Sequence, residues 1–198
     1  MIRYISDLHL GHHNVITFDG RPFSDTDEMN DYLQDKWNMT VHKNDTIYIL
    51  GDFCWYTDQI WQSLLRNLKG NKVLISGNHD LKQMSSRLKT LFADIKPYKE
   101  IEDGDRRVIL SHYPIMCYRR SYDENTWMLH GHTHNTQEQQ YVEKWTRELV
   151  FKRMNHSDNC GHIMNVGCML PHMQYEPKTL DEIIDAWRNK YVKGDKDE

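Results

Sequence analysis

The stretch Val73-Leu74-Ile75-Ser76-Gly77-Asn78-His79-Asp80 indicates both the fold and the chemistry of this chain. Its apolar start is short, contains β-branched residues and ends at Gly77, which is typical of a buried strand followed by a tight turn. Beyond the turn, Asn78 offers a neutral oxygen ligand and His79 a proton donor or acceptor near neutral pH. Asp80 could orient that imidazole. The tetrapeptide alone is weak evidence, because Gly-Asn pairs are also common in ordinary turns.

The first half of the chain alternates short apolar runs with helical patterns. Strands are expected over residues 1–6, 46–50 and 73–75, and helices over 58–69 and 81–92. Another helix is expected after Ser24 or Asp25, since apolar residues recur at helical spacing up to Trp37. This alternation predicts parallel strands joined by crossover helices.

The second half has weaker patterns. Strands are expected over residues 107–110, 127–129 and 163–166, and a loop or short hairpin over 135–159. Thr179 and Glu182 have capping-box spacing and predict a C-terminal helix. We expect one domain over residues 1–198, with a frayed tail from about 193 to 198.

Composition narrows the class of protein. The 198 residues carry a net charge of -4, so no overall basic field favours nucleic acid as a partner, although a nuclease with a local basic groove stays possible. No apolar run reaches the roughly 18 residues that a membrane helix needs. Four cysteines without paired spacing suit the cytoplasm. Twelve histidines beside 29 acidic residues point to a metal site.

Polar residues with metal-binding chemistry follow the predicted strands. They are Asp7, His9, Asp52, Asn78, His112, His132 and His134. Ligands of open α/β sheets bind beyond the carboxyl ends of the strands, so these residues could meet in one crevice. Asp7 and His9, one residue apart, would point to the same side of an extended backbone.

The type of these side chains predicts which cations could bind. Carboxylate, imidazole and amide oxygen ligands without a thiolate suit manganese, which we favour, and also iron, zinc, cobalt or nickel. An aspartate such as Asp52 could bridge two divalent ions about 3.5–4 Å apart. Two such ions lower the pKa of a shared water and offset the charge of a phosphoryl group.

The full pattern resembles that of the calcineurin-like metallophosphoesterases, in their small, single-domain bacterial or phage form. The resemblance runs from about Ile2 to Val166 and rests on Asp7-x-His9, Gly51-Asp52, Gly77-Asn78-His79-Asp80, His112 and Gly131-His132-x-His134. It implies an α/β fold in which two mixed β-sheets pack as a sandwich flanked by helices, a four-layer α/β/β/α arrangement. It also implies a dinuclear metal centre at the strand ends.

The resemblance assigns a role to each motif residue. The first metal would be held by Asp7, His9, Asp52 and His134, and the second by Asp52, Asn78, His112 and His132. His79 would donate a proton to the leaving oxygen or steady the transition-state charge, and Asp80 would orient His79. A metal-bridging hydroxide would attack phosphorus in line, without a covalent intermediate.

Specificity would have to come from the loops over residues 11–23, 117–123 and 135–159. Arg21, Arg119 and Arg120 are candidate substrate contacts because guanidinium binds phosphate oxygens bidentately, and His12 is a further candidate. For each of the arginines, a surface charge is the favoured alternative.

We therefore expect a cytoplasmic metal-dependent phosphoesterase that hydrolyses phosphodiesters or small nucleotide-like substrates. A phosphomonoesterase, including a protein phosphatase, and a nuclease are alternatives on the same centre. A non-catalytic metal-binding scaffold is an alternative of a different class. The substrate, the native metals and the oligomeric state stay open at this point.

Overall fold

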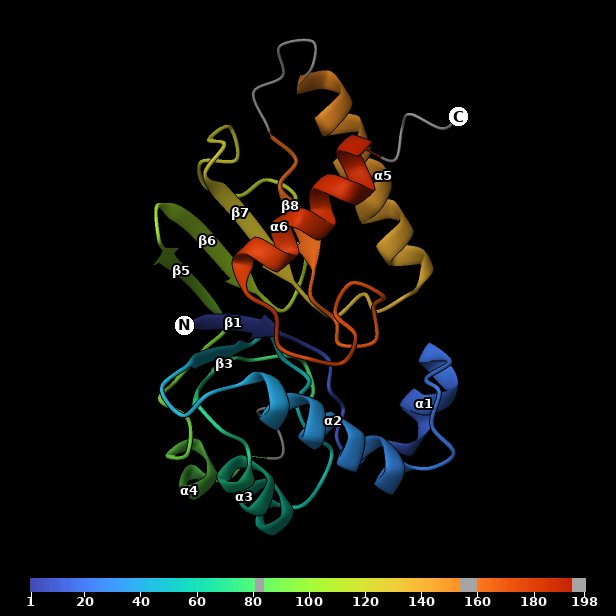
Figure 1. The fold of residues 1–198 in the computed structure, drawn as a ribbon, viewed down its shortest axis with the longest axis vertical. Coiled ribbons are helices and arrows are strands. Elements are labelled where there is room, and N and C mark those ends of the chain that lie inside the picture. The colour runs from blue at the N-terminus through green and yellow to red at the C-terminus, as the bar shows by residue number, and fades with distance from the viewer. Residues whose placement is uncertain (81–83, 154–159, 194–198) are drawn as a thin grey trace.

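The structure is a computed structural model that describes residues 1–80, 84–153 and 160–193. It contains two four-stranded sheets, ordered β1-β2-β3-β4 and β5-β6-β7-β8. In the view of Figure 1, α2, α3 and α4 lie below the first sheet, and α5 and α6 lie beside the second. The predicted α/β sandwich of two sheets flanked by helices is confirmed.

The first sheet is built from short strands that are buried over most of their length. It comprises β1 (Ile2–Ile5), β2 (Thr46–Ile49), β3 (Asn71–Ile75) and β4 (Asp94–Lys96), and all three pairings are parallel. The crossovers contain α2 (Thr26–Thr40), α3 (Asp58–Asn67) and α4 (Ser86–Lys89). Asp25 caps α2 by accepting a hydrogen bond from the Glu28 N–H, as one of the two predicted caps.

The second sheet is mixed. Strand β5 (Tyr98–Asp103) pairs antiparallel with β6 (Arg106–Ser111), while β7 (Thr126–His130) and β8 (Ile163–Asn165) continue in parallel. Helices α5 (Gln137–Arg153) and α6 (Leu180–Arg188) belong to this half, and a π-helical turn, η2 (Asn189–Lys193), follows α6. The capping box of Thr179 and Glu182 is confirmed at the start of α6.

The two sheets meet along the end of β1. The Ser6 N–H donates to the Val166 carbonyl at 2.9 Å, and the Cys168 N–H donates to the Ser6 carbonyl at 2.9 Å. One hydrophobic core runs through both sheets, from Ile5 and Leu50 to Leu129. Because β1 joins the sheets, the carboxyl ends of strands from both halves open onto one rim.

Two expectations about loops were wrong. Residues 137–153 form α5 rather than a loop or hairpin, because several residues that pack inward on this helix are polar and interrupt the apolar pattern; Gln139 and Thr146 are both buried. Residues 13–19 form a short helix, α1 (His13–Asp19), which ends at Gly20 in a left-handed conformation.

Other predicted boundaries shift. Of the helix expected over 81–92, residues 81–83 lie outside the described residues, and the described helix spans only Ser86–Lys89. The expected frayed tail lies outside the described residues from 194 onward. Among the described residues, no helix is both long and apolar enough to cross a membrane.

Candidate metal centre

The candidate ligands stand in the loops that follow the strands, and most of them have a left-handed backbone. The φ values of Asp7, His9, Asp52, His132 and His134 are 54°, 50°, 51°, 67° and 44°. Such a conformation costs a non-glycine residue about 1–3 kcal/mol. The extended backbone expected between Asp7 and His9 is therefore wrong, and turns at each ligand aim the side chains instead.

Hydrogen bonds between loops hold these turns. The Asp7 N–H donates to the Gly51 carbonyl at 3.1 Å, and the His9 N–H donates to the Asp52 carbonyl at 3.0 Å. The His132 N–H donates to both carboxylate oxygens of Asp7 at 3.1 Å. These contacts link loops of both sheets and offset the conformational cost.

Two motif glycines let backbone approach the carboxylates. A Cβ at Gly77 would overlap Oδ1 of Asp52, and one at Gly131 would lie 2.5 Å from Oδ2 of Asp7. Any side chain at either position would displace a candidate ligand, so close approach explains why the motif needs glycine there.

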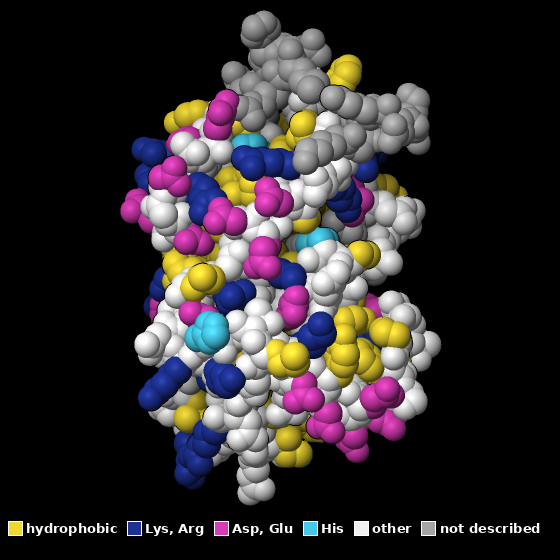
Figure 2. All heavy atoms as spheres, in the orientation of Figure 1, with side chains coloured by type: hydrophobic (Ala, Val, Ile, Leu, Met, Phe, Trp, Pro, Cys, Tyr) yellow, Lys and Arg dark blue, Asp and Glu magenta, His cyan; other side chains and the backbone are white. Residues whose placement is uncertain are grey.

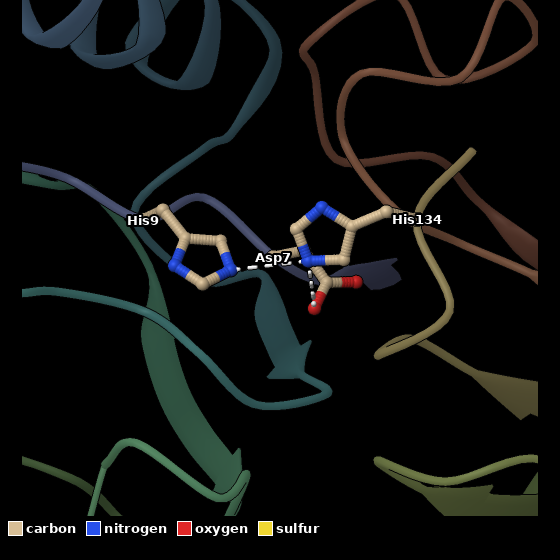
Figure 3. A group of neighbouring side chains, drawn as sticks. All are labelled: Asp7, His9 and His134. Atoms are coloured by element: carbon tan, nitrogen blue, oxygen red, sulfur yellow. Dashed lines mark hydrogen bonds and ion pairs between the residues drawn. The ribbon is translucent and has the colours of Figure 1, made fainter. Parts of the chain in front are cut away.

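A first ligand group consists of Asp7, His9 and His134, whose ligand atoms lie within 4.8 Å of one another. The two Nε2 atoms of His9 and His134 are 3.1 Å apart, and His134 Nε2 is 3.6 Å from Asp7 Oδ1. Figure 3 shows the two rings turning these nitrogens toward each other beside the Asp7 carboxylate. Burial lowers the pKa of His9 well below its usual range, so this imidazole is neutral and can donate a lone pair.

A second ligand group shares Asp7 and adds Asp52 and His112. His112 Nε2 is 3.6 Å from Asp52 Oδ2 and 3.0 Å from Asn78 Oδ1. His112 Nδ1 lies 2.8 Å from the Leu50 carbonyl oxygen, which can only accept a hydrogen bond. Nδ1 therefore carries the proton, and Nε2 is left free to bind a cation.

The residues present fit a pair of divalent cations. Asp7 and Asp52 are buried, and His9 Nε2 lies 3.7 Å from the same Asp52 oxygen that His112 approaches, so Asp52 of the second group also lies near a histidine of the first. Among the described residues, the ion pairs of both carboxylates are with histidines only. A buried carboxylate needs a cation to offset its charge, and this donor set is one that divalent transition metals prefer.

Asp19 holds His134 of the first ligand group in place, and the sequence did not point to this residue. Its Oδ1 lies 2.8 Å from His134 Nδ1, and its Oδ2 lies 2.8 Å from Nη2 of Arg21. Burial acts to lower the pKa of His134, but the hydrogen bond with Asp19 and the charge of Asp7 outweigh it and raise that pKa. Asp19 is the sole carboxylate in residues 11–23, which is the one signal that could have identified it.

Arg21 does not lie where a phosphate clamp should be, and that expectation was wrong. Its fully buried guanidinium donates to the carbonyls of Leu8 at 2.9 Å and Asp7 at 2.8 Å, in addition to its pair with Asp19. These contacts use the donors that a substrate would need and fix the loop that bears Asp7.

Arg119 and Arg120 remain surface residues in this structure. The Arg119 side chain is 65% exposed and its Nη1 lies 3.3 Å from Glu100, while Arg120 is exposed with a φ of 58°. Within the described residues, neither has a recorded contact with a ligand group, so their role as substrate contacts stays a prediction.

Asp80 has a different position from the one expected. Its carboxylate accepts hydrogen bonds from the backbone N–H groups of Asp52 at 2.9 Å, Phe53 at 3.0 Å and Gly77 at 2.7 Å. Burial raises its pKa, partly opposed by these bonds. Its recorded contacts do not include the His79 ring, so Asp80 ties the Asp52 loop to the Gly77 turn rather than orienting His79.

His79 stands at the open side of the site. Its ring packs against Trp55 at a centroid distance of 4.5 Å, and Trp55 stacks in turn on His12 at 4.3 Å. His79 Nε2 is 4.0 Å from Asp52 Oδ2, and the side chain is 42% exposed. His79 lies outside both ligand groups but near them, a position suited to proton transfer. His12 stacks on Trp55, and its ring also lies 5.4 Å from the ring of the candidate ligand His9.

His132 is partly buried beside the second ligand group. It belongs to neither ligand group, and its ring is 5.0 Å from the His112 ring and 4.5 Å from the Tyr113 ring. Burial lowers its pKa, which favours the neutral form. The structure thus brings Asp7, His9, Asp52, Asn78, His112 and His134 together and leaves His132 beside them.

Comparisons with known proteins identify the family of this chain. A model of the calcineurin-like phosphoesterase family matches residues 2–190. An uncharacterized protein of Methanocaldococcus jannaschii is 35% identical over 135 residues, which cover 67% of this chain and 69% of that protein. The gene 66 protein of Mycobacterium phage D29 is 30% identical over 157 residues, or 67% of this chain and 77% of that protein.

A solved structure has a similar fold. A protein of unknown function from Aquifex aeolicus matches with a TM-score of 0.60 and 26% identity, over 94% of this chain and 98% of that one. The family match spans both sheets and every candidate ligand. The chain belongs to the calcineurin-like phosphoesterase family.

Proposed function

We propose that this protein is a dinuclear metal-dependent phosphoesterase that acts on phosphodiesters or small nucleotide-like substrates. One observation carries the proposal: two buried carboxylates, Asp7 and Asp52, face histidine nitrogens within 4.8 Å, and histidines are their only ion-pair partners among the described residues.

Each ligand group would hold one of two cations. Asp7, His9 and His134 would hold one, Asn78 and His112 the other, and Asp52 would bridge them. Bound there, two cations would supply a water of lowered pKa and offset the charge of the phosphoryl group. We favour manganese for this donor set, with iron, zinc, nickel or cobalt as alternatives.

Residues outside the ligand groups would handle the leaving group. His79, held against Trp55 at the open side, would give a proton to the leaving oxygen. Its distance of 4.0 Å from Asp52 keeps the ring near the phosphoryl position without using it as a ligand. Asp80 would act through the backbone, because it fixes the turn that bears Asn78 and His79.

The arginines favour a diester over a monoester. A phosphate monoester carries up to two negative charges and a diester carries one, so cationic side chains beside the bound cations would favour a monoester. Arg21 is occupied by backbone carbonyls, and Arg119 is paired with Glu100. In the upper part of the face shown in Figure 2, Lys and Arg lie among Asp and Glu, whereas in the lower part Lys and Arg gather on the left and Asp and Glu on the right. The basic side chains therefore form no continuous track along this face.

The cysteines agree with a reducing compartment. All four, including the exposed Cys117, are free thiols. We propose a cytoplasmic location and a small phosphate ester as the partner.

The test compares two chromogenic substrates on purified full-length protein. After chelation and re-addition of Mn²⁺, we expect hydrolysis of bis-p-nitrophenyl phosphate to exceed that of p-nitrophenyl phosphate. A preference for the monoester would replace the diester proposal with a phosphatase. No turnover of either substrate, with metal bound, would favour the non-catalytic scaffold.

A further inference from the structure

A pocket opens beside the candidate metal centre, on the side of helix α5. Its volume is about 610 Å³, within the range of roughly 300–1,000 Å³ that is usual for small-molecule sites. His132 lines the pocket, and its ring lies 5.0 Å from that of the candidate ligand His112, so the pocket adjoins the candidate metal centre.

The walls of this pocket present aromatic rings to solvent. Tyr113 follows His112 directly, while Tyr141 and Trp145 project from α5 one helical turn apart. Their exposed fractions are 49%, 63% and 37%, high values for large apolar side chains gathered at one place. A cluster of exposed apolar side chains next to a site is typical of a surface that binds a ligand or a protein partner.

The α5 wall is held in place by polar contacts with other segments. Gln139 accepts hydrogen bonds from Thr133 at 2.6 Å and Asn165 at 2.9 Å, and donates to Glu143 at 3.0 Å. Lys190 pairs with Glu143 at 2.5 Å from the turn after α6. These contacts fasten α5 to the His132 loop and to β8, so the pocket is formed before a ligand arrives.

The negative charge among the lining residues favours some classes of ligand over others. Among the described residues that line the pocket, Glu138 is the one carboxylate, and there is no Lys or Arg. Among the described residues, the Glu138 side chain makes no hydrogen bond or ion pair, although its charge acts on the nearby His132. A carboxylate repels a second phosphate and only accepts hydrogen bonds, so it fits a neutral group that bears N–H donors.

We infer that this pocket binds the alcohol part of the substrate, and that this part carries a planar ring with N–H donors, as a nucleoside does. The rings of Tyr113, Tyr141 and Trp145 would pack on the planar face, since base–aromatic contact tolerates any base. Glu138 would accept from the N–H edge.

This inference rests on the proposed function, because it places the phosphoryl group at the candidate metal centre. In the reaction, the bond between phosphorus and the oxygen of the ring-bearing alcohol breaks. Water supplies the hydroxyl group that joins phosphorus, and the alcohol leaves with a proton on its oxygen.

Binding can be tested without turnover. Calorimetric titration of the chelated full-length protein with guanosine, which carries adjacent N–H donors, should show binding, and ribose should show none at tenfold higher concentration. Trp145→Ala should weaken guanosine binding about tenfold.

Glu138→Gln should weaken the binding of guanosine more than the binding of 1-methylguanosine, which lacks one N–H donor. Phe151→Ala, an exposed aromatic residue of α5 outside the pocket lining, should change binding less than twofold.

The two proposals fail in different ways. Equal binding of guanosine and ribose, while Mn²⁺-dependent diester hydrolysis persists, would overturn the pocket assignment and leave the proposed function intact. Guanosine binding without any hydrolysis would overturn the proposed function and the substrate assignment with it. A dimer that Trp145→Ala dissociates, with guanosine affinity unchanged, would also overturn the assignment by identifying a second copy as the occupant.

Discussion

The floor of the candidate site and its rim are built in different ways. The floor consists of the buried carboxylates of Asp7, Asp52 and Asp80, which accept hydrogen bonds from backbone N–H groups or stand between histidines. The rim consists of His79, His132 and the α5 pocket, whose rings pack on other rings and face solvent.

This difference separates two kinds of function. A floor fixed by buried hydrogen bonds can hold cations in one geometry, and changing it affects metal binding and folding together. A rim made of exposed rings can change without loss of the fold, so it is the part that can set the substrate. Substitutions should therefore divide into those that remove the chemistry or the fold and those that change only turnover or specificity.

Removal of the Asp52 carboxylate, the proposed bridge between the two cations, should have the largest effect. Asp52→Asn is expected to lower kcat for diester hydrolysis about 1,000-fold or more, because a bound metal supplies several kcal/mol of transition-state stabilisation. Steady-state kinetics with excess Mn²⁺ measures this, with Asp31→Asn on the exposed side of α2 as the matched control. Activity close to that of the unchanged protein would show that Asp52 holds no essential metal.

A change at the rim should spare the metal. His79→Ala is expected to lower kcat about 100-fold through loss of the proton donor, while Mn²⁺ content stays unchanged. Atomic absorption after desalting measures the metal, and His13→Ala on the exposed face of α1 is the control. Loss of bound metal in His79→Ala would assign His79 to the floor.

Asp19, which holds the candidate ligand His134, should affect the affinity for Mn²⁺ more than turnover at saturating metal. Asp19→Asn removes the charge that orients His134, and we expect Mn²⁺ affinity to fall about 10- to 100-fold. Because the ligands remain, saturating Mn²⁺ should restore kcat to within a few-fold. Activity as a function of free Mn²⁺ separates the two effects. An unchanged Mn²⁺ midpoint would mean that the Asp19–His134 contact does not prepare the ligand.

The smallest effect on turnover should come from Asp80, although its effect on stability should be clear. Asp80→Asn leaves an amide with one acceptor oxygen facing three N–H donors, which should cost about 2 kcal/mol and lower Tm by roughly 4–8 °C. Thermal unfolding followed by circular dichroism measures this shift. If Asp80→Asn left Tm unchanged and lowered kcat as much as His79→Ala does, Asp80 would instead orient His79, as first expected.

Much of the floor could be predicted from sequence because its signals are local. Each ligand follows an apolar run, and the rule that parallel strands expose their carboxyl ends together brings the runs to one rim. The left-handed turns at Asp7 and His9 could not be predicted from this rule, which assumes an extended chain. Asp19 was missed because its partner His134 lies 115 residues away, a separation that no local pattern reports.

The rim was harder to predict because the sequence of α5 lacks a regular helical pattern of apolar residues. Buried Gln139 and Thr146 interrupt the apolar stripe that marks a helix, and the hydrogen bonds that make their burial favourable come from Asn165 and Thr133 in other segments and from the helix backbone. A pattern of apolar residues cannot anticipate such satisfied polar groups. The pocket beside His132 was missed for the same reason.

The most direct test of the central claim joins metal content to turnover. Chelated protein is titrated with Mn²⁺ while bound Mn²⁺ per chain and hydrolysis of bis-p-nitrophenyl phosphate are measured on the same samples. We expect no activity before metal is added, and activity that rises until two ions are bound per chain. Hydrolysis that survives complete removal of metal, or two bound ions with no hydrolysis of diester or monoester, would contradict the account.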